Sequence, residues 1–270
     1  MVETLPPKPV MFVSRDFDHK WIGNYMKKKH LALSHLIGKQ ETSSLYFSLG
    51  DFTDLITRIS AVPGVGGVKV YFASYCPTGT AEVDAIAHAG WMDLLTLVFS
   101  ATDKRANDLQ ESYFMIKPLG GVLSLSKDTA QTLVTCFKTK KVPLLTTIIK
   151  DAGVPDFQET RSFWYPLSNF NGPFDIIKEM KMDGAAGITA FIGAYGEKDT
   201  APATGQDVSW QLNVVFELVK AVKHGSTSYY YHFDLENTPD WSHRPDPGLG
   251  LEGADTSNPC PPAICGSGLG

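Results

Sequence analysis

Two stretches of the chain, residues 10–119 and 122–235, follow the same succession of strands and helices, and this repeat constrains the fold more than any other feature. The segment 10–16 matches 122–128 at an offset of 112 residues. Further matches keep the same order: 45–52 with 163–170, 68–75 with 188–195, 94–98 with 212–216 and 112–119 with 228–235. The offsets change in Gly-, Pro- or polar-rich stretches, where loops accept insertions. We therefore predict an internal duplication.

The sequence pattern of each repeat predicts the order β-α-β-α-β-β followed by a further strand. We expect these elements to form an α/β fold with mixed sheets. An α+β fold fits the same pattern. The first helix is expected to begin at Ser14 or Asp16, and its counterpart at Ser126 or Asp128, because these side-chain oxygens can accept from first-turn N–H groups. Continuous apolar runs such as 94–99 are typical of buried strands.

The two repeats could form two small domains, or they could pair about a pseudo-two-fold axis into one larger core. We favour the shared core, because about 110 residues with several apolar strands bury more surface together. Aromatic residues stand at equivalent places ahead of the second helix of each repeat. Core packing is the simpler interpretation of this framework, but if the repeats join, these residues are expected at their interface: Tyr46, Phe47, Trp164 and Tyr165.

Charge and hydropathy exclude some classes of partner. The formal net charge is −5, which argues against nucleic acid or an anionic membrane as the main partner, since phosphate binding needs a basic surface. No apolar run of 18 residues occurs, and the N-terminus lacks a charged region followed by an apolar core. We therefore expect a cytoplasmic protein without a membrane segment, whose four cysteines are mostly thiols.

Known catalytic motifs do not occur in the sequence: there is no P-loop, no GxGxxG after a strand, no GxSxG, no HExxH and no CxxC pair. The glycine-rich segment 63–67 follows a predicted helix and precedes a strand, so it is interpreted as a turn rather than an anion site. Cys76 lies at the end of the predicted strand 68–75, where active-site residues often occur in α/β sheets. It is a weak nucleophile candidate, because no histidine partner is evident.

The segment 236–270 has no equivalent in the first repeat and contains six prolines and six glycines. We expect an irregular tail. Histidine, carboxylate and thiol groups gather in and just before it, and they make weak candidates for acid–base catalysis (His232 and Asp234) or for zinc binding (His232, His243, Cys260 and Cys265). The alternatives are a structural His232, and a disulfide or assembly contact for the two cysteines; no cofactor is required.

The strand 68–75, the run 94–99 and the ending Cys260-Pro261-Pro262-Ala263-Ile264-Cys265 resemble a group of uncharacterised bacterial hypothetical proteins. Members of that group carry one such unit and a short Cys-Pro-Pro tail. This chain departs from them by having two units and an additional residue between the tail cysteines. The resemblance covers about half of the chain and implies no activity and no catalytic residue.

Three functional hypotheses follow. The leading one is a non-enzymatic binding or self-assembly protein, whose partner is another protein or a second copy of itself and whose tail makes contacts. The second is a metal-dependent or Cys/His-based enzyme of hydrolase type, with its site near the tail. The third is a sensor that binds a small molecule between the two units.

Overall fold

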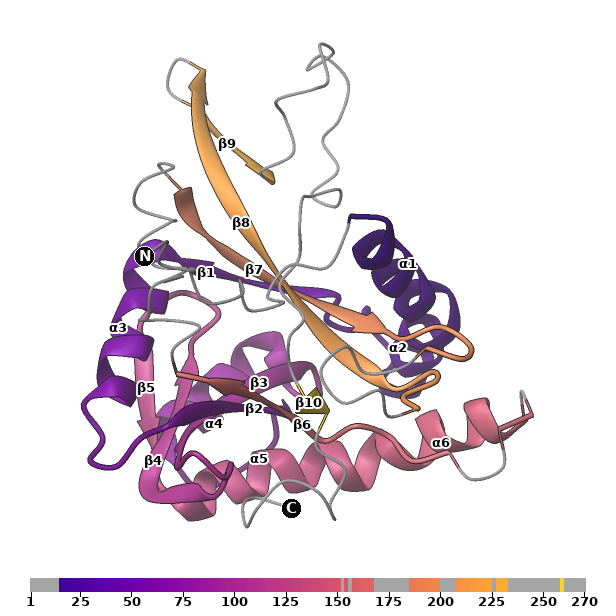
Figure 1. Ribbon diagram of the computed structural model, residues 1–270, viewed down its shortest axis with the longest axis horizontal. Coiled ribbons are helices and arrows are strands. Elements are labelled where there is room, and N and C mark those ends of the chain that lie inside the picture. Colours follow the sequence, from indigo (N-terminus) through magenta and orange to yellow (C-terminus); the bar gives the residue numbers. More distant parts are fainter. Residues whose placement is uncertain are drawn as a thin grey trace, which may run out of the picture.

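The computed structural model describes residues 15–151, 153–154, 157–167, 185–199, 207–224, 227–232 and 258–259. Helices and strands alternate along the chain, in agreement with the predicted α/β class (Figure 1). The helices are α1 (Arg15–Tyr25), α2 (Leu31–Ile37), α3 (Leu49–Ser60), α4 (Ala81–Ile86), α5 (Lys127–Lys140) and α6 (Val142–Asp151), with π-helical turns η1 (Met26–His30) and η2 (Ala87–Trp91). The part of the first repeat before Arg15 and residues 168–184 of the second repeat lie outside the described residues.

The strands form two sheets. Sheet A has the order β1-β7-β8-β9 and sheet B the order β10-β6-β2-β3-β4-β5. Their bounds are β1 (Ser44–Ser48), β2 (Gly67–Ser74), β3 (Leu95–Thr102), β4 (Asp108–Ile116), β5 (Val122–Leu125), β6 (Ser162–Pro166), β7 (Ala185–Ala194), β8 (Leu212–His224), β9 (Thr227–His232) and β10 (Asn258–Pro259). Every described pairing is antiparallel, so the prediction of mixed sheets is wrong.

Each sheet combines strands from both halves of the chain. β1 pairs with β7, placing Phe47 opposite Ile188. β6 pairs with β2, placing Tyr165 opposite Val68. A helix that lies earlier in the sequence than each of these strands packs on the same sheet. Helix α1 packs on β7 of sheet A, and α5 packs on β2 of sheet B. Thus α1 and β1, from the first half, belong to sheet A, whose other strands come from the second half. In the same way α5 and β6, from the second half, belong to sheet B, whose other strands come mainly from the first half.

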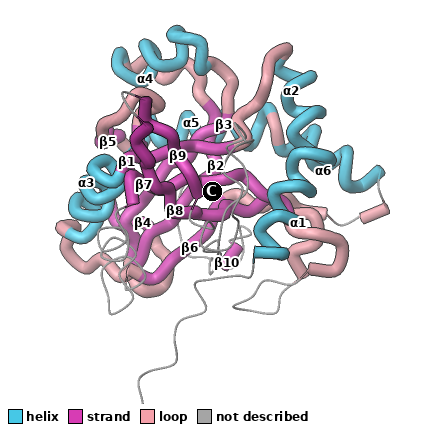
Figure 2. The backbone as a smooth tube through the Cα atoms, turned by 90° about the horizontal axis from the view of Figure 1, so that it is seen from above, coloured by secondary structure: helices cyan, strands magenta, loops and turns pink. Residues whose placement is uncertain are grey.

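The main core lies between the two sheets, and helices surround the strands (Figure 2). Its members include Val70 and Phe72 of β2, Ile188 of β7 and Phe216 of β8. A second cluster joins the outer face of sheet B to α5, and a third joins the outer face of sheet A to α1 through Trp21. The arrangement is therefore helix, sheet, sheet, helix.

Side-chain caps explain where two helices begin. Ser48 accepts from the backbone N–H of Asp51 at the start of α3, and Ser126 accepts from Thr129 N–H at the start of α5. Such caps satisfy N–H groups that a first helical turn leaves without partners. Of the two caps predicted for this helix, Ser126 and Asp128, it is Ser126 that caps α5.

Helix α3 packs at the rim between the sheets, where it contacts β7 of sheet A and β3, β4 and β5 of sheet B. Its buried side chains are Phe52, Leu55, Ile56 and Ile59, which recur at helical spacing on one face. Strand β2 is buried along its whole length, as expected for a central strand with both faces covered. Within the described part of the chain, no helix combines the length and the apolar character needed to cross a membrane.

Candidate functional site

Two buried ion pairs join the halves of the chain. Lys29 pairs with Glu159, and Lys141 pairs with Glu41. In each pair the lysine comes from one half and the glutamate from the other. All four side chains are at most 1% exposed.

The two glutamates use their oxygens in the same way. In each, Oε2 accepts from the lysine Nζ, while Oε1 accepts from two backbone N–H groups. For Glu41 these are the N–H groups of Thr42 (2.8 Å) and Leu95 (2.7 Å). For Glu159 the corresponding donors are Thr160 (3.0 Å) and Leu212 (2.6 Å). Each carboxylate therefore connects a lysine to the first residue of a central strand, β3 or β8.

Local irregularities in the helices position both lysines. Lys29 lies in the π-helical turn η1, and Lys141 lies at the junction between α5 and α6. Such irregularities often mark functional positions. Two neighbours of Lys29 fix the chain around Glu41: Tyr25 donates its hydroxyl to Thr42 O (2.8 Å), and His30 Nε2 lies 2.9 Å from Glu41 O.

Burial dominates the electrostatics of this region. It lowers the pKa of Lys29, an effect that the adjacent Glu159 opposes. Burial, reinforced by the charge of Glu41, raises the pKa of Tyr25 well above its ordinary value. Removing either partner of such a pair leaves a buried charge without compensation. The arrangement suits holding the halves together, since its polar groups face one another.

A second polar cluster lies on the outer face of sheet B. Lys69 Nζ is 3.6 Å from Asp108 Oδ1, and Tyr71 donates its hydroxyl to Asp108 Oδ2 at 2.7 Å. Tyr113 also bonds to Asp108. Burial lowers the pKa of Lys69, opposed by Asp108, and burial together with the Asp108 charge raises the pKa of Tyr113. An amine, a carboxylate and two phenols are components of acid–base chemistry, but the Lys69 and Asp108 side chains are only 2% and 4% exposed.

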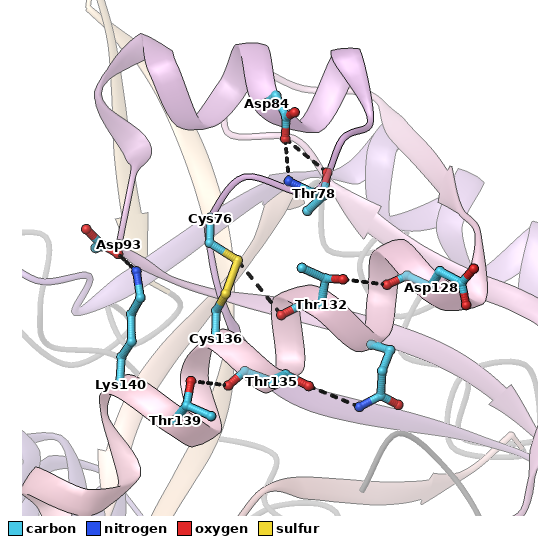
Figure 3. The surroundings of a disulfide bond; sticks show 11 residues. Cys76, Thr78, Asp84, Asp93, Asp128, Thr132, Thr135, Cys136, Thr139 and Lys140 are labelled. Atoms are coloured by element: carbon cyan, nitrogen blue, oxygen red, sulfur yellow. Dashed lines mark hydrogen bonds and ion pairs between the residues drawn. A yellow bond between two sulfur atoms is a disulfide. The ribbon is translucent and has the colours of Figure 1, made fainter.

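A disulfide links Cys76 to Cys136 across 60 residues (Figure 3). Cys76 follows β2, as predicted, and Cys136 lies in α5, so the bond ties the end of a central strand to the covering helix. The expectation of free thiols is wrong for these two residues. Cys76 has no thiol in this structure and cannot act as a nucleophile in this state.

Hydrogen bonds hold the loop after Cys76 (Figure 3). The Asp84 carboxylate accepts from the Thr78 N–H and hydroxyl and from the Gly79 N–H. These bonds, led by the one from the Thr78 N–H, lower the pKa of Asp84. The Thr80 and Thr129 hydroxyls, 2.8 Å apart, connect the same loop to α5.

On sheet A, a non-covalent link occupies the comparable place between the end of β7 and α1. Asp199 accepts from Lys20 Nζ (3.0 Å), from Trp21 Nε1 (2.9 Å) and from Gly196 N–H (2.6 Å). Asn24 Nδ2 donates to Ala194 O. Burial favours the neutral acid of Asp199, but these three donors outweigh it and lower its pKa.

The four aromatic residues expected at an interface all lie on strands that pair with the opposite half. Phe47 and Tyr165 are buried in the main core, where each ring contacts a phenylalanine, Phe99 or Phe216. Tyr46 is 44% exposed and donates to Ala186 O. Trp164 is half-buried and donates to the Thr102 hydroxyl at 2.8 Å.

Apart from Cys76, the candidate catalytic and zinc-binding residues lie at or beyond the end of the described part of the second half. His232 is the last residue of β9, and its side chain is not among those described. Asp234, His243, Cys260 and Cys265 lie outside the described residues. Among the residues that are described, no group of three or more His, Cys, Asp or Glu side chains is placed to hold a metal ion.

Sequence reasoning missed the two glutamates and the structural role of the two lysines. A signal was present: Gln40-Glu41-Thr42-Ser43-Ser44 and Gln158-Glu159-Thr160-Arg161-Ser162 agree at four of five positions and end at the first residue of β1 and of β6. Lys29 and Lys141 occupy equivalent places in the sequence repeat, but lysines at the end of a helix are more typical of a solvated end that balances the helix dipole.

Comparison of the chain with protein-family models, with curated protein sequences and with solved structures gave no match.

Proposed function

We propose that this protein is a non-enzymatic binding or self-assembly protein built from two related units, residues 10–119 and 122–235, that form one pseudo-symmetric body. In this proposal each unit contributes a helix and a strand to the sheet of the other. The main support for this proposal is the two buried Lys–Glu pairs. In each pair a lysine Nζ of one unit donates to a glutamate Oε2 of the other unit.

Sequence spacing supports the relation between the units. Lys29 and Lys141 are 112 residues apart, and Glu41 and Glu159 are 118 apart, which are the offsets of the sequence repeat at these places. The strand registers support it as well. Ser48 lies opposite Gly187 and Pro166 lies opposite Gly67, and in both cases an aromatic side chain of the incoming strand passes over the glycine.

The state of the buried ionisable groups supports a packing role over a catalytic one. Lys29, Tyr25, Lys69 and Tyr113 all have shifted pKa values, and each is engaged with another group of the protein. A catalytic acid or base has to reach its substrate within hydrogen-bond distance. These groups face inward, so the surface of the body and its tail are left to make contacts with a partner or a second copy.

Light scattering coupled to gel filtration tests the self-assembly form of this proposal. The full chain is measured over a wide range of concentration, beside a chain that lacks residues 236–270. We expect the mass of the full chain to rise with concentration. If both proteins keep the monomer mass at every concentration, the protein does not self-assemble.

A further inference from the structure

One short turn connects the two proposed units. It consists of residues 117–121, between the end of β4 and the start of β5. Lys117 N–H donates to Gly121 O at 3.0 Å, and Gly120 N–H donates to Lys117 O at 2.9 Å. From outside the turn, Asp51 Oδ1 accepts from Gly121 N–H at 2.7 Å. Opening the turn therefore breaks local bonds and leaves the elements of each unit as they are.

The contacts that hold the units together would be the same if the units came from two different chains. Strand β1 of the first unit pairs with β7 of the second, and β6 of the second unit pairs with β2 of the first. The two buried Lys–Glu pairs and the Cys76–Cys136 disulfide also join the first unit to the second. A dimer in which two chains exchange units would therefore contain each of these contacts twice, and would differ from two monomers mainly in the turn.

The sequence of the turn suits an extended hinge as well as a closed turn. Gly120 and Gly121 have φ angles of 93° and 87° in the closed turn, and glycine also adopts extended conformations. Pro118 favours an extended backbone at Lys117 and has no N–H to leave without a partner. Leu119 is 95% exposed, the largest exposed fraction among the large apolar side chains that the structure describes. In an exchanged dimer the two hinges lie on either side of the two-fold axis, so the two Leu119 side chains can cover one another.

We propose that two copies of this chain exchange units: the turn at 117–121 opens, and the first unit of each chain packs on the second unit of the other. This inference rests on the proposed self-assembly function and names its interface, which is the one between the units. Exchange of an identical element is a low-cost route to a dimer, because its contacts already exist in the monomer. Two units on one short linker have an effective concentration on the order of millimolar, so we expect monomers at low protein concentration and dimers as the concentration approaches that value.

The Cys76–Cys136 disulfide determines when the exchange can occur (Figure 3). Cys76 belongs to the first unit and Cys136 to the second. A bond formed within one chain crosslinks the two units of that chain and blocks the exchange. The exchange therefore requires both thiols to be reduced, and later oxidation of the dimer bonds Cys76 of one chain to Cys136 of the other.

Oxidation of two different variants together tests the exchange. One variant carries Cys136→Ser and the other Cys76→Ser, and both also carry Cys260→Ser and Cys265→Ser, so each has a single thiol. They are unfolded with a thiol reagent, refolded without it as a mixture at high concentration, and oxidised with glutathione disulfide, which takes two electrons and two protons from the two thiols and becomes two molecules of glutathione. On a denaturing gel without reductant we expect a band at twice the chain mass that contains both variants. Each variant refolded alone should not give this band, because its exchanged dimer places serine opposite the remaining cysteine.

The matched control has its thiol on the neighbouring residue of α5. It carries Thr135→Cys, with all four native cysteines replaced by serine. Thr135 is exposed, whereas Cys76 is only 2% exposed in the apolar cluster beneath α5. A chance collision would bond the exposed thiol more readily, but the exchange requires the thiol at position 136. We therefore expect the band to be lost when this control replaces the Cys76→Ser variant in the mixture.

Deletion of residues 117–121 tests the hinge without changing a cysteine. It joins β4 directly to β5, so the chain cannot reverse and the closed monomer cannot form. We expect this variant to be dimeric at concentrations where the original chain is monomeric, while insertion of a flexible Gly/Ser segment after Leu119 should favour the monomer. A folded, monomeric deletion variant would overturn the exchange.

Circular dichroism and thermal unfolding confirm that each variant is folded. If the original chain dimerises but the mixed variants give no more of the band than the control, the exchange is wrong while self-assembly through another surface stands. If the original chain is monomeric at every concentration and no bond forms between the variants, both proposals are overturned.

Discussion

Removing the Cys76–Cys136 disulfide is expected to lower the free energy of unfolding by about 4 kcal/mol. The bond closes a loop with a sequence separation of 60 residues. In the chain-entropy treatment, a crosslink restricts the unfolded chain by an amount that grows with the logarithm of loop length, which gives about 4 kcal/mol for this loop. The native state should change little, because the Cys76 sulfur lies in an apolar cluster with Ala130 and Leu133 that a thiol also fits.

Urea unfolding of the double variant Cys260→Ser/Cys265→Ser measures this effect, because Cys76 and Cys136 are then the only cysteines. The oxidised protein and the protein reduced with a thiol reagent are compared, and thiol titration in denaturant confirms each state. We expect a lower midpoint after reduction. The slope should rise, since the unfolded chain without its crosslink exposes more surface.

The triple variant that also carries Cys136→Ser is the control for side effects of the reductant. Its stability should match that of the reduced protein and should not respond to reductant. Equal unfolding free energies for the oxidised and reduced proteins would refute the reasoning.

Three further substitutions, two of them with a matched control, test individual contacts. Lys141→Met should cost roughly 3–5 kcal/mol in urea unfolding, because it leaves Glu41 charged and buried, whereas Lys140→Met, which breaks only the exposed pair with Asp93, should cost less than about 1 kcal/mol. Gly67→Ala should cost roughly 1–3 kcal/mol, because its Cβ would lie 2.2 Å from Trp164 Nε1; Gly50→Ala, with no atom nearer than 3.8 Å, should be neutral or stabilising in the same assay. The pKa of Asp199 is lowered in the folded state, so its contribution to stability is present above the unfolded pKa near 3.8 and is lost as the pH falls through the folded pKa. Asp199→Asn should therefore flatten the dependence of Tm on pH in this acidic range, and an unchanged dependence would count against the role of Asp199.

Local features of the fold could be predicted because they depend on neighbouring residues. Ser126, one of the two predicted caps, caps α5, because its hydroxyl reaches an N–H three residues ahead. The apolar run at 94–99 lies almost wholly in β3, which is buried along its length inside sheet B, and residues 212–217 at the start of β8 are buried inside sheet A. Helix α3 begins at Leu49 for the same kind of reason, because the Ser48 side chain accepts from the Asp51 N–H.

Long-range choices were not accessible to sequence patterns. β1 has the same alternation of side chains whether it pairs with β2 or with β7, so nothing local predicts that it joins the opposite half. The pairing of Cys76 with Cys136 is equally hidden, because spacing does not specify connectivity. The relation between β3 and β8 was also shifted by one residue: Leu95 and Leu212, which make equivalent bonds to the glutamates, are 117 residues apart, whereas the sequence alignment used 118.

The candidate site was missed for a related reason. Three consecutive lysines at 27–29 suggest a solvated helix end, and Lys27 and Lys28 are indeed exposed. Lys29 is turned inward by the π-helical turn, a backbone irregularity that residue type does not predict. Burial of a lysine also requires a partner, and Glu159 is supplied by a segment 130 residues away.

The pairing of β1 with β7 has a consequence for synthesis on the ribosome. About 140 residues must be translated after β1 before its partner has emerged. At about 5–20 residues per second this takes roughly 7–30 s. During that interval Leu45 and Phe47 cannot reach their native neighbours on β7, and nascent chains on one messenger RNA hold many copies of the same segment close together. We therefore expect chaperones to bind the nascent chain early. We also expect slow refolding and aggregation when the purified protein is diluted from denaturant.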